Sequence, residues 1–243
     1  MEATQRQMIR EKMRGNLLRG MGHDIRTPLT GIIGATDVLL KQDETLTPQQ
    51  RRELLQSINE EAKWLMRVSE NLLSITRIDG ENAGVKKTPE LVEEIIEGAV
   101  SKFLRHYQGI AVQVHLPEEP MLVPMDPLLM QQVLFNLMEN AARHGETVKQ
   151  IDIFLYQQED KAILEVADDG VGIAHSRLEH LFDGTLHPEE GREDARRDMG
   201  IGLSVCRTIV VAHGGSITAS NQKNGGALFR IALPMDKEET HEN

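Results

Sequence analysis

The chain has 243 residues, 40% of them hydrophobic, which is enough for one large domain or two small ones with packed cores. Only 3% of the residues are aromatic, so Leu, Ile, Val and Met must supply most of the core. The net charge of -11 argues against nucleic acid or an anionic membrane as the main partner. A single cysteine, Cys206, excludes an intrachain disulfide framework.

The sequence shows no targeting or membrane-spanning segment. No apolar run approaches the roughly 18–20 residues of a membrane span, and no signal peptide opens the chain. The lone cysteine fits a reducing compartment. We therefore expect a cytoplasmic protein, or the cytoplasmic portion of a longer membrane-bound one.

Helical periodicity dominates the N-terminal third of the chain. Between Arg14 and Lys41 the apolar residues recur at intervals of three, four or seven. They are Leu18, Met21, Ile25, Leu29, Ile32 and Leu39. Pro28 should kink this helix or strain its preceding turn. A second helix should begin at Pro48 with Thr47 as its N-cap, and its heptad seam is formed by Ile58, Ala62, Leu65, Ser69, Leu72 and Thr76.

These two helices predict a hairpin over residues 1–79. The apolar stripes of one hairpin stay half-buried in a monomer, so pairing two hairpins into a dimeric four-helix bundle would bury the seam. An antiparallel pair packed on a second domain of the same chain is the alternative. The turn Asp79–Gly84 marks the domain boundary.

His23 is the candidate nucleophile of the hairpin. It lies two residues past Met21, about 200° around the helix, so it projects away from the seam into solvent. Its ordinary pKa near 6.5 leaves the imidazole mostly neutral at cytoplasmic pH. Asp24 beside it can take or orient the imidazole proton; an ordinary solvated carboxylate is the alternative.

Residues 85–235 have a mixed pattern that predicts a two-layer α/β sandwich, followed by a polar tail at 236–243. The predicted helices cover Glu90–Tyr107, Pro127–His144, Arg177–Phe182 and Ile201–His213. The predicted strands are Ile110–His115, Met121–Met125, Ile151–Tyr156, Ala162–Ala167, Ser216–Ser220 and Ala227–Leu233.

Two asparagines mark a ligand site on the helix Pro127–His144. Asn136 and Asn140 share one face of an otherwise apolar segment, where unsatisfied amides would be costly to bury. Amide oxygens suit Mg²⁺, although both side chains could instead be satisfied structural amides. Arg143, one turn further on, could reach a phosphate or be a solvated cation.

Two glycine-containing turns could accept a nucleotide. Gly170 and Gly172 allow close backbone approach after a strand that ends in Asp168, whose carboxylate can accept a hydrogen bond from an amino group. Gly200 and Gly202 open a helix whose N-terminus can receive phosphate. Each turn alone is a weak signal.

Taken in order, four segments resemble the H, N, G1 and G2 boxes of sensor histidine kinases. They are His23–Leu29, Asn136–Ala141, Asp168–Gly172 and Gly200–Leu203. The resemblance implies an α+β chain: a dimeric helical hairpin followed by a two-layer ATP-binding domain of the Bergerat (GHKL) type. The segment His23–Thr30, followed by Ile32–Ala35, looks like the potassium-sensor group of these kinases.

The resemblance also assigns roles to the nucleotide site. It implies that Asp168 reads adenine and that Asn140, with Asn136, holds Mg²⁺. Gly200 and Gly202, with Leu203, would border a lid over the phosphates of ATP. In the gyrase and chaperone branches a Glu stands at the place of Asn136 and activates water, so Asn136 favours transfer to a protein nucleophile over hydrolysis.

The stretch Asp183–Met199 would be that lid, and His144 could lie near the nucleotide. The family often carries two aromatic residues at the start of the lid. This chain has Phe182 but Thr185-Leu186 where the second would fall. The cations of the stretch, Arg192, Arg196 and Arg197, could equally be solvated charges.

The implied activity is autophosphorylation of His23 from ATP, followed by transfer to an aspartate of a response-regulator receiver domain. Thr27, on the same face as His23, would orient water for dephosphorylating the regulator; alternatively it is a helix hydroxyl bonded to a carbonyl. Two other functions stay open: a phosphatase-biased or inactive scaffold that binds ATP, and a hydrolytic ATPase of the gyrase or chaperone type.

Overall fold

The computed structural model describes residues 25–41, 45–78, 85–145, 147–182 and 201–235. His23, Asp24, Gly200 and the stretch Asp183–Met199 lie outside these residues. The contacts divide the chain into two compact units, Met1–Leu73 and Ser74–Asn243. None of the described helices is long and apolar enough to span a membrane.

The first unit contains a helix over residues 25–41 and most of α2 (Pro48–Ile78). The first helix is unbroken across Pro28, whose side chain is buried. Thr47 caps α2, as predicted: the backbone N–H of Gln50 donates to Thr47 Oγ1 at 3.2 Å, and the N–H of Thr47 donates to Gln50 Oε1 at 3.0 Å. This reciprocal capping box satisfies two backbone donors at the start of the helix.

The apolar residues of the hairpin are divided between two faces. Ala35 and Val68 are buried, and the predicted seam residues Ile58, Leu65 and Leu72 are half-buried. A second set of large apolar side chains is exposed: Leu29, Ile33, Leu40, Leu55, Met66 and Leu73. A single hairpin therefore leaves apolar surface in solvent, most of it outside the predicted seam, and the seam residues Ala62 and Ser69 are exposed as well.

The second unit is built on a five-stranded sheet with the order β2-β4-β5-β7-β6. Its strands are β2 (Ala111–His115), β4 (Gln150–Gln158), β5 (Lys161–Asp168), β6 (Ser216–Asn221) and β7 (Ala227–Pro234). Strand β2 runs parallel to β4, and the other neighbours are antiparallel. A separate two-stranded sheet pairs β1 (Thr88–Leu91) with β3 (Leu122–Met125).

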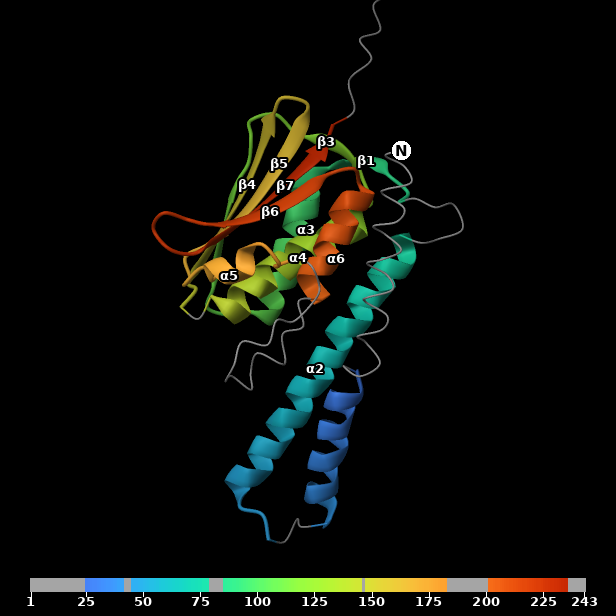
Figure 1. Cartoon of the computed structure of the whole chain (residues 1–243), viewed down its shortest axis with the longest axis vertical. Coiled ribbons are helices and arrows are strands. Elements are labelled where there is room, and N and C mark those ends of the chain that lie inside the picture. The colour runs from blue at the N-terminus through green and yellow to red at the C-terminus, as the bar shows by residue number, and fades with distance from the viewer. Residues whose placement is uncertain (1–24, 42–44, 79–84, 146, 183–200, 236–243) are drawn as a thin grey trace, which may run out of the picture. The chain divides into compact units, whose positions relative to one another are not determined.

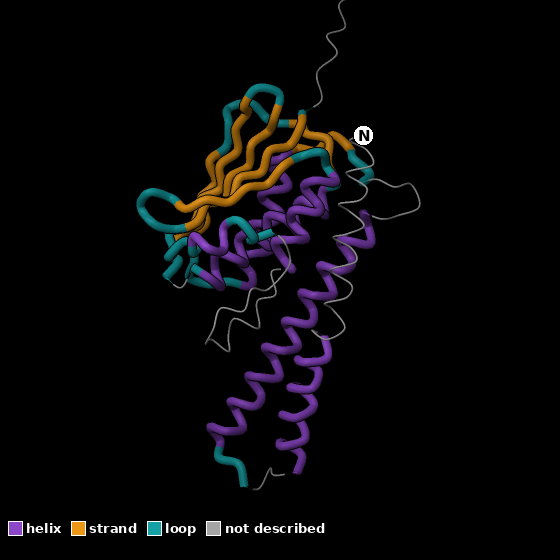
Figure 2. The backbone as a smooth tube through the Cα atoms, viewed as in Figure 1, coloured by secondary structure: helices purple, strands orange, loops and turns teal. Residues whose placement is uncertain are grey.

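Three helices cover one face of the larger sheet: α3 (Val92–His106), α4 (Pro127–His144) and α6 (Ile201–Ala212) (Figures 1 and 2). Alternate residues of β4 point into this layer, and Ile151, Ile153 and Leu155 are buried. Each such side chain contributes about 1.5–3 kcal/mol when it leaves water. The predicted two-layer sandwich is confirmed.

Two local predictions were wrong. Glu90 and Leu91 belong to strand β1 rather than to the following helix, because they pair with β3. The short helix near residue 177 is α5 (His175–Leu178), which is shorter than predicted and begins earlier. Helix α4 has the predicted bounds, and Asp126, which was not predicted as its cap, accepts from the N–H groups of Leu128 and Leu129, both at 3.0 Å.

Candidate functional site

Helices α4 and α6 run antiparallel, and this direction brings the sequence motifs together. At one end, Nε2 of His213 accepts a hydrogen bond from the N–H of Asp126 at 2.9 Å. In the middle, the thiol of Cys206 lies 3.8 Å from the carbonyl oxygen of Val133. The start of α6, with Gly202 and Leu203, therefore lies toward the end of α4 that carries Asn140 and Arg143.

Asn136 is held inside this helix pair. It is only 7% exposed. Its Oδ1 accepts from Nε2 of Gln132 at 2.8 Å, and its side chain also hydrogen-bonds the Cys206 thiol. Burial raises the pKa of that thiol to about 12, although the bond from Asn136 opposes the rise. Gln132 was not predicted as a site residue, because its contact with Asn136 is visible only once the helix is built.

Asn140 is one turn further along α4 and half-buried. Its side-chain amide has no hydrogen-bond partner among the residues that the structure describes. Arg143 is exposed and His144 half-buried at the end of the same helix. Of the two asparagines, Asn140 thus has the side-chain oxygen that is available to a ligand.

Asp168 ends strand β5 and is 5% exposed. Its Oδ1 accepts from the N–H of Gly170 at 2.9 Å and from the N–H of Ala227 at 3.2 Å. Burial raises the pKa of Asp168 above its ordinary value, although these two hydrogen bonds oppose the rise. Oδ2 accepts no hydrogen bond from the described part of the chain, so one carboxylate oxygen is fixed and the other is open to a donor.

The glycine turn after β5 packs against the end of α4. A Cβ on Gly170 would lie 2.6 Å from the carbonyl oxygen of Gly145, which follows the last residue of α4. The N–H of Val171 donates to that same oxygen at 3.3 Å. Gly172 has a φ of +78°, a conformation that favours glycine. The G1 motif is therefore adjacent to the end of α4, the helix that carries the N motif.

The described site is thus assembled from α4, the turn after β5 and the start of α6. Gly202 lies in the first turn of α6, and a Cβ there would meet nothing within 4 Å among the described residues. Thr27 is exposed on the helix over 25–41. The predicted roles of His23, Asp24 and Gly200 fall outside the described residues, as does the predicted lid.

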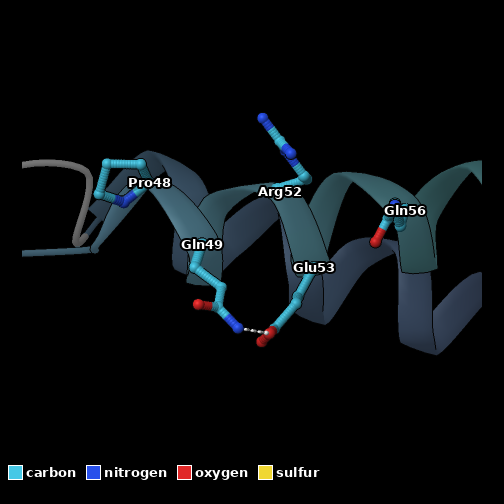
Figure 3. A pocket seen from close by; sticks show the side chains of 5 residues that line it. All are labelled: Pro48, Gln49, Arg52, Glu53 and Gln56. Carbon is cyan, nitrogen blue, oxygen red and sulfur yellow. Dashed lines mark hydrogen bonds between the residues drawn. The ribbon is translucent and has the colours of Figure 1, made fainter.

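The first unit contains a hollow on α2 (Figure 3). It is lined by Pro48, Gln49, Arg52, Glu53 and Gln56. All five belong to the first turns of α2, and Gln49 Nε2 donates to Glu53 Oε1 at 3.1 Å. Since one exposed helix supplies the whole lining, we assign it no function.

Comparison with known families now defines the class of the second unit. The profile of the histidine kinase-, DNA gyrase B- and HSP90-like ATPases matches residues 125–237, so this unit contains an ATP-binding domain of that class. The profile of the His kinase A (phospho-acceptor) domain matches residues 13–81. The chain belongs to the sensor histidine kinases, and it carries both domains of their catalytic core.

Individual relatives support the same conclusion. The chain is 37% identical over 235 residues to sensor protein KdpD of Clostridium acetobutylicum, covering 97% of this chain and 26% of that protein. It is 33% identical over 241 residues to KdpD of Escherichia coli, covering 96% and 26%. The chain therefore spans about a quarter of the length of these curated relatives. The likeness agrees with the potassium-sensor (KdpD-like) group predicted from the sequence.

A solved structure shares the fold of nearly the whole chain. The histidine kinase ThkA, in complex with the response regulator protein TrrA, matches with a TM-score of 0.71 and 24% identity. The match covers 98% of this chain and 66% of that one. The predicted α+β fold, a helical hairpin followed by a mixed-sheet ATP-binding domain, is confirmed.

Proposed function

We propose that this chain autophosphorylates His23 from ATP and passes the phosphoryl group to an aspartate of a response-regulator receiver domain, which it also dephosphorylates. One observation supports the proposal most directly: the buried Asp168 keeps Oδ2 open at the end of the unit where Asn140 offers an amide oxygen. An adenine nucleotide with bound Mg²⁺ requires an acceptor for its amino group and, at the other end of the nucleotide, an oxygen ligand for the metal.

The nucleotide would lie between α4 and the turn after β5. Asp168 Oδ2 would accept a hydrogen bond from the adenine amino group, because Oδ1 is already occupied by Gly170 and Ala227. Gly170 and Gly172 would keep side chains away from the purine. Gly200, Gly202 and Leu203 would border the phosphates at the start of α6, and Arg143 would contribute positive charge.

The two asparagines fit a magnesium site in which water and phosphate oxygens complete the coordination. Asn140 would be the direct ligand, since Oδ1 of Asn136 already accepts from Gln132. Asn136 would support that site from inside the helix pair. When bound, Mg²⁺ neutralises charge on the phosphates of ATP.

In the phosphoryl transfer, His23 of the helical hairpin would be the nucleophile. A ring nitrogen of His23 attacks the γ-phosphorus, the bond to the β–γ bridging oxygen breaks, and ADP leaves with that electron pair. Asp24 takes or orients the imidazole proton. Asn136 cannot act as the base that a Glu provides in the hydrolytic branches, so the site favours transfer to histidine over transfer to water.

We further propose that the hairpin over residues 1–79 forms a homodimer, with the ATP-binding domain over 85–235 and a polar tail at 236–243. The exposed apolar side chains of the hairpin support dimerisation, because two copies could bury them in one four-helix bundle. Sedimentation equilibrium should give twice the chain mass at micromolar concentration. A monomer mass that does not change with concentration would exclude the dimer.

The regulator would dock on the same hairpin. Thr27 is exposed there, consistent with a role in orienting water for dephosphorylation. The structure of ThkA contains a response regulator, which supports a receiver domain as the partner here. Thr27→Ala should slow dephosphorylation of the regulator while autophosphorylation continues, whereas equal loss of both activities would contradict this role. The cytoplasmic location expected from the sequence stays a prediction.

The kinase is tested by incubation with γ-labelled ATP and Mg²⁺. Label that is acid-labile, alkali-stable and absent from His23→Ala would identify the acceptor. His115→Ala is the matched control, because His115 is an exposed histidine on β2 and should leave labelling intact. ATP binding without label would support the scaffold alternative, while steady phosphate release without labelled protein would support a hydrolytic ATPase.

A further inference from the structure

The β-hairpin formed by β6 and β7 makes hydrogen bonds to the turn that follows β5. The two strands pair up to Asn221 and Ala227, and the hairpin closes with the N–H of Gln222 donating to the carbonyl oxygen of Gly226 at 2.9 Å. The turn after β5 is held on its other side by Gly145, at the end of α4. The contacts that the β6–β7 hairpin makes with this turn therefore set the direction of the Asp168 side chain.

Asn221 binds the far end of this turn with both atoms of its amide. Its Oδ1 accepts from the N–H of Ile173 at 2.7 Å, and its Nδ2 donates to the carbonyl oxygen of Ile173 at 2.7 Å. The side chain thus pairs with Ile173 as a neighbouring strand would. A Cβ on Gly172 would lie 2.8 Å from the same Oδ1, so only a glycine fits beside this pair.

Gln222 and its neighbours bind the near end of the turn. Nε2 of Gln222 donates to the carbonyl oxygen of Asp168 at 2.8 Å, and the N–H of Ala227 donates to Oδ1 of Asp168 at 3.2 Å. Gly226 lies so close that a Cβ on it would fall 1.7 Å from that carbonyl oxygen. The hairpin therefore holds both the backbone and one carboxylate oxygen of Asp168.

We propose that Asn221 and Gln222 are positioning residues for the purine: by fixing both ends of the turn, they aim Oδ2 of Asp168 at the adenine amino group. The inference rests on the proposed role of Asp168. It adds that selectivity for adenine depends on two residues of a different hairpin, which do not need to touch the nucleotide.

Loss of the Asn221 or Gln222 side chain is not expected to unfold the domain. Asn221 and Gln222 are exposed, and the buried residues of β7 begin after them in the chain. Removing either side chain deletes hydrogen bonds to the turn and empties no part of the core. The loss should therefore be felt in the orientation of Asp168 and not in the integrity of the sheet.

The test measures displacement of a fluorescent trinitrophenyl-ADP by ADP and by GDP, using the whole chain. Guanine carries a carbonyl where adenine carries its amino group, so the ratio of the two affinities reports how well Asp168 is aimed. For Asn221→Ala and Gln222→Ala we expect ADP affinity to fall about tenfold, near the loss of one hydrogen bond to a buried charged group. GDP affinity should change little, so the ADP-to-GDP ratio should fall by about the same factor.

Asn224→Ala is the matched control, because Asn224 is an exposed asparagine of the same hairpin without a side-chain hydrogen bond to the described residues. It should keep the ratio of the parent chain. An unchanged ratio in both variants, or a parallel fall for ADP and GDP, would overturn the positioning role. If Asn221→Ala does not fold, Gln222→Ala alone decides. Failure of the parent chain to prefer ADP would instead contradict the proposed role of Asp168.

Discussion

The side chain of His213 joins the two helices of the nucleotide site at the end away from Asn140. Its Nε2 accepts from the N–H of Asp126, and its Nδ1 lies 2.7 Å from the carbonyl oxygen of Ile209. These contacts require a neutral ring with the proton on Nδ1. The residue is 1% exposed, and Nζ of Lys87 donates to its carbonyl oxygen at 2.7 Å.

Acid should loosen this junction. Burial lowers the pKa of His213 below its ordinary value of 6.5, helped by the nearby charge of Lys87 and opposed by the Ile209 bond and by Asp126. In the window below 6.5 the unfolded chain binds the proton more readily than the folded chain. The His213 contribution to stability is therefore complete above that window and is lost as the pH falls toward the folded-state pKa.

Urea unfolding of the parent chain and of His213→Gln between pH 7.5 and 5 measures this contribution. The difference in unfolding free energy between the two chains should shrink as the pH falls. A difference that is constant over the range would show that His213 does not titrate differently in the folded and unfolded chains.

Cys206 should be inert in the folded protein. Burial raises the pKa of its thiol to about 12, and the thiolate is the reactive form. A disulfide reagent such as dithiobis(nitrobenzoate) should therefore modify Cys206 only after urea unfolds the ATP-binding domain. One thionitrobenzoate should then be released per chain. Rapid labelling in the absence of denaturant would contradict the packing of α6 against α4.

Gly226 should tolerate no side chain. Its φ is +87°, and an added Cβ would clash with the Asp168 backbone. Gly109 is a matched control, because its φ is +92° but an added Cβ meets nothing within 4 Å. Gly109→Ala should cost about 1–2 kcal/mol from backbone strain alone. Gly226→Ala should lose more unfolding free energy and also ADP affinity; equal losses would contradict the close approach.

Gly202 should behave in the opposite way. It lies in the first turn of α6, where an alanine would meet no described atom and would favour the helix by roughly 0.5–1 kcal/mol. Gly202→Ala is therefore expected to keep or raise the unfolding free energy while lowering ADP affinity about tenfold, if phosphate approaches this backbone. Unchanged affinity would exclude that approach. Thermal unfolding and calorimetric titration of the same samples separate the two effects.

Much of the local structure could be predicted from short stretches of sequence. Thr47 and Pro48 mark the start of α2, and Asp126 with Pro127 marks the start of α4, because caps act within one helical turn. The apolar alternation of Ala227–Leu233 predicts β7, because a period of two residues is also a local pattern. The four boxes were recognisable because each is contiguous or repeats at helical spacing.

Other features depend on contacts between distant residues. Leu91 lies in a strand only because Leu122 pairs with it, which overrides the helical pattern that follows. The parallel pairing of β2 with β4 likewise joins two segments that are separated in the chain by β3 and α4.

The sequence by itself determined the helices, most strands and the chemistry of the site, since periodicity, capping and motif spacing act over a few residues. Only the tertiary structure decided how the carboxylate of Asp168 is held. The N–H of Ala227 donates to its Oδ1, Gln222 donates to the backbone carbonyl oxygen of Asp168, and Asn221 binds the same turn from 48 residues beyond Ile173. The physical reason is that a polar turn such as Asn221–Gly226 carries no local signal for its partner. Its hydrogen bonds exist only once packing of the sheet brings the two turns together.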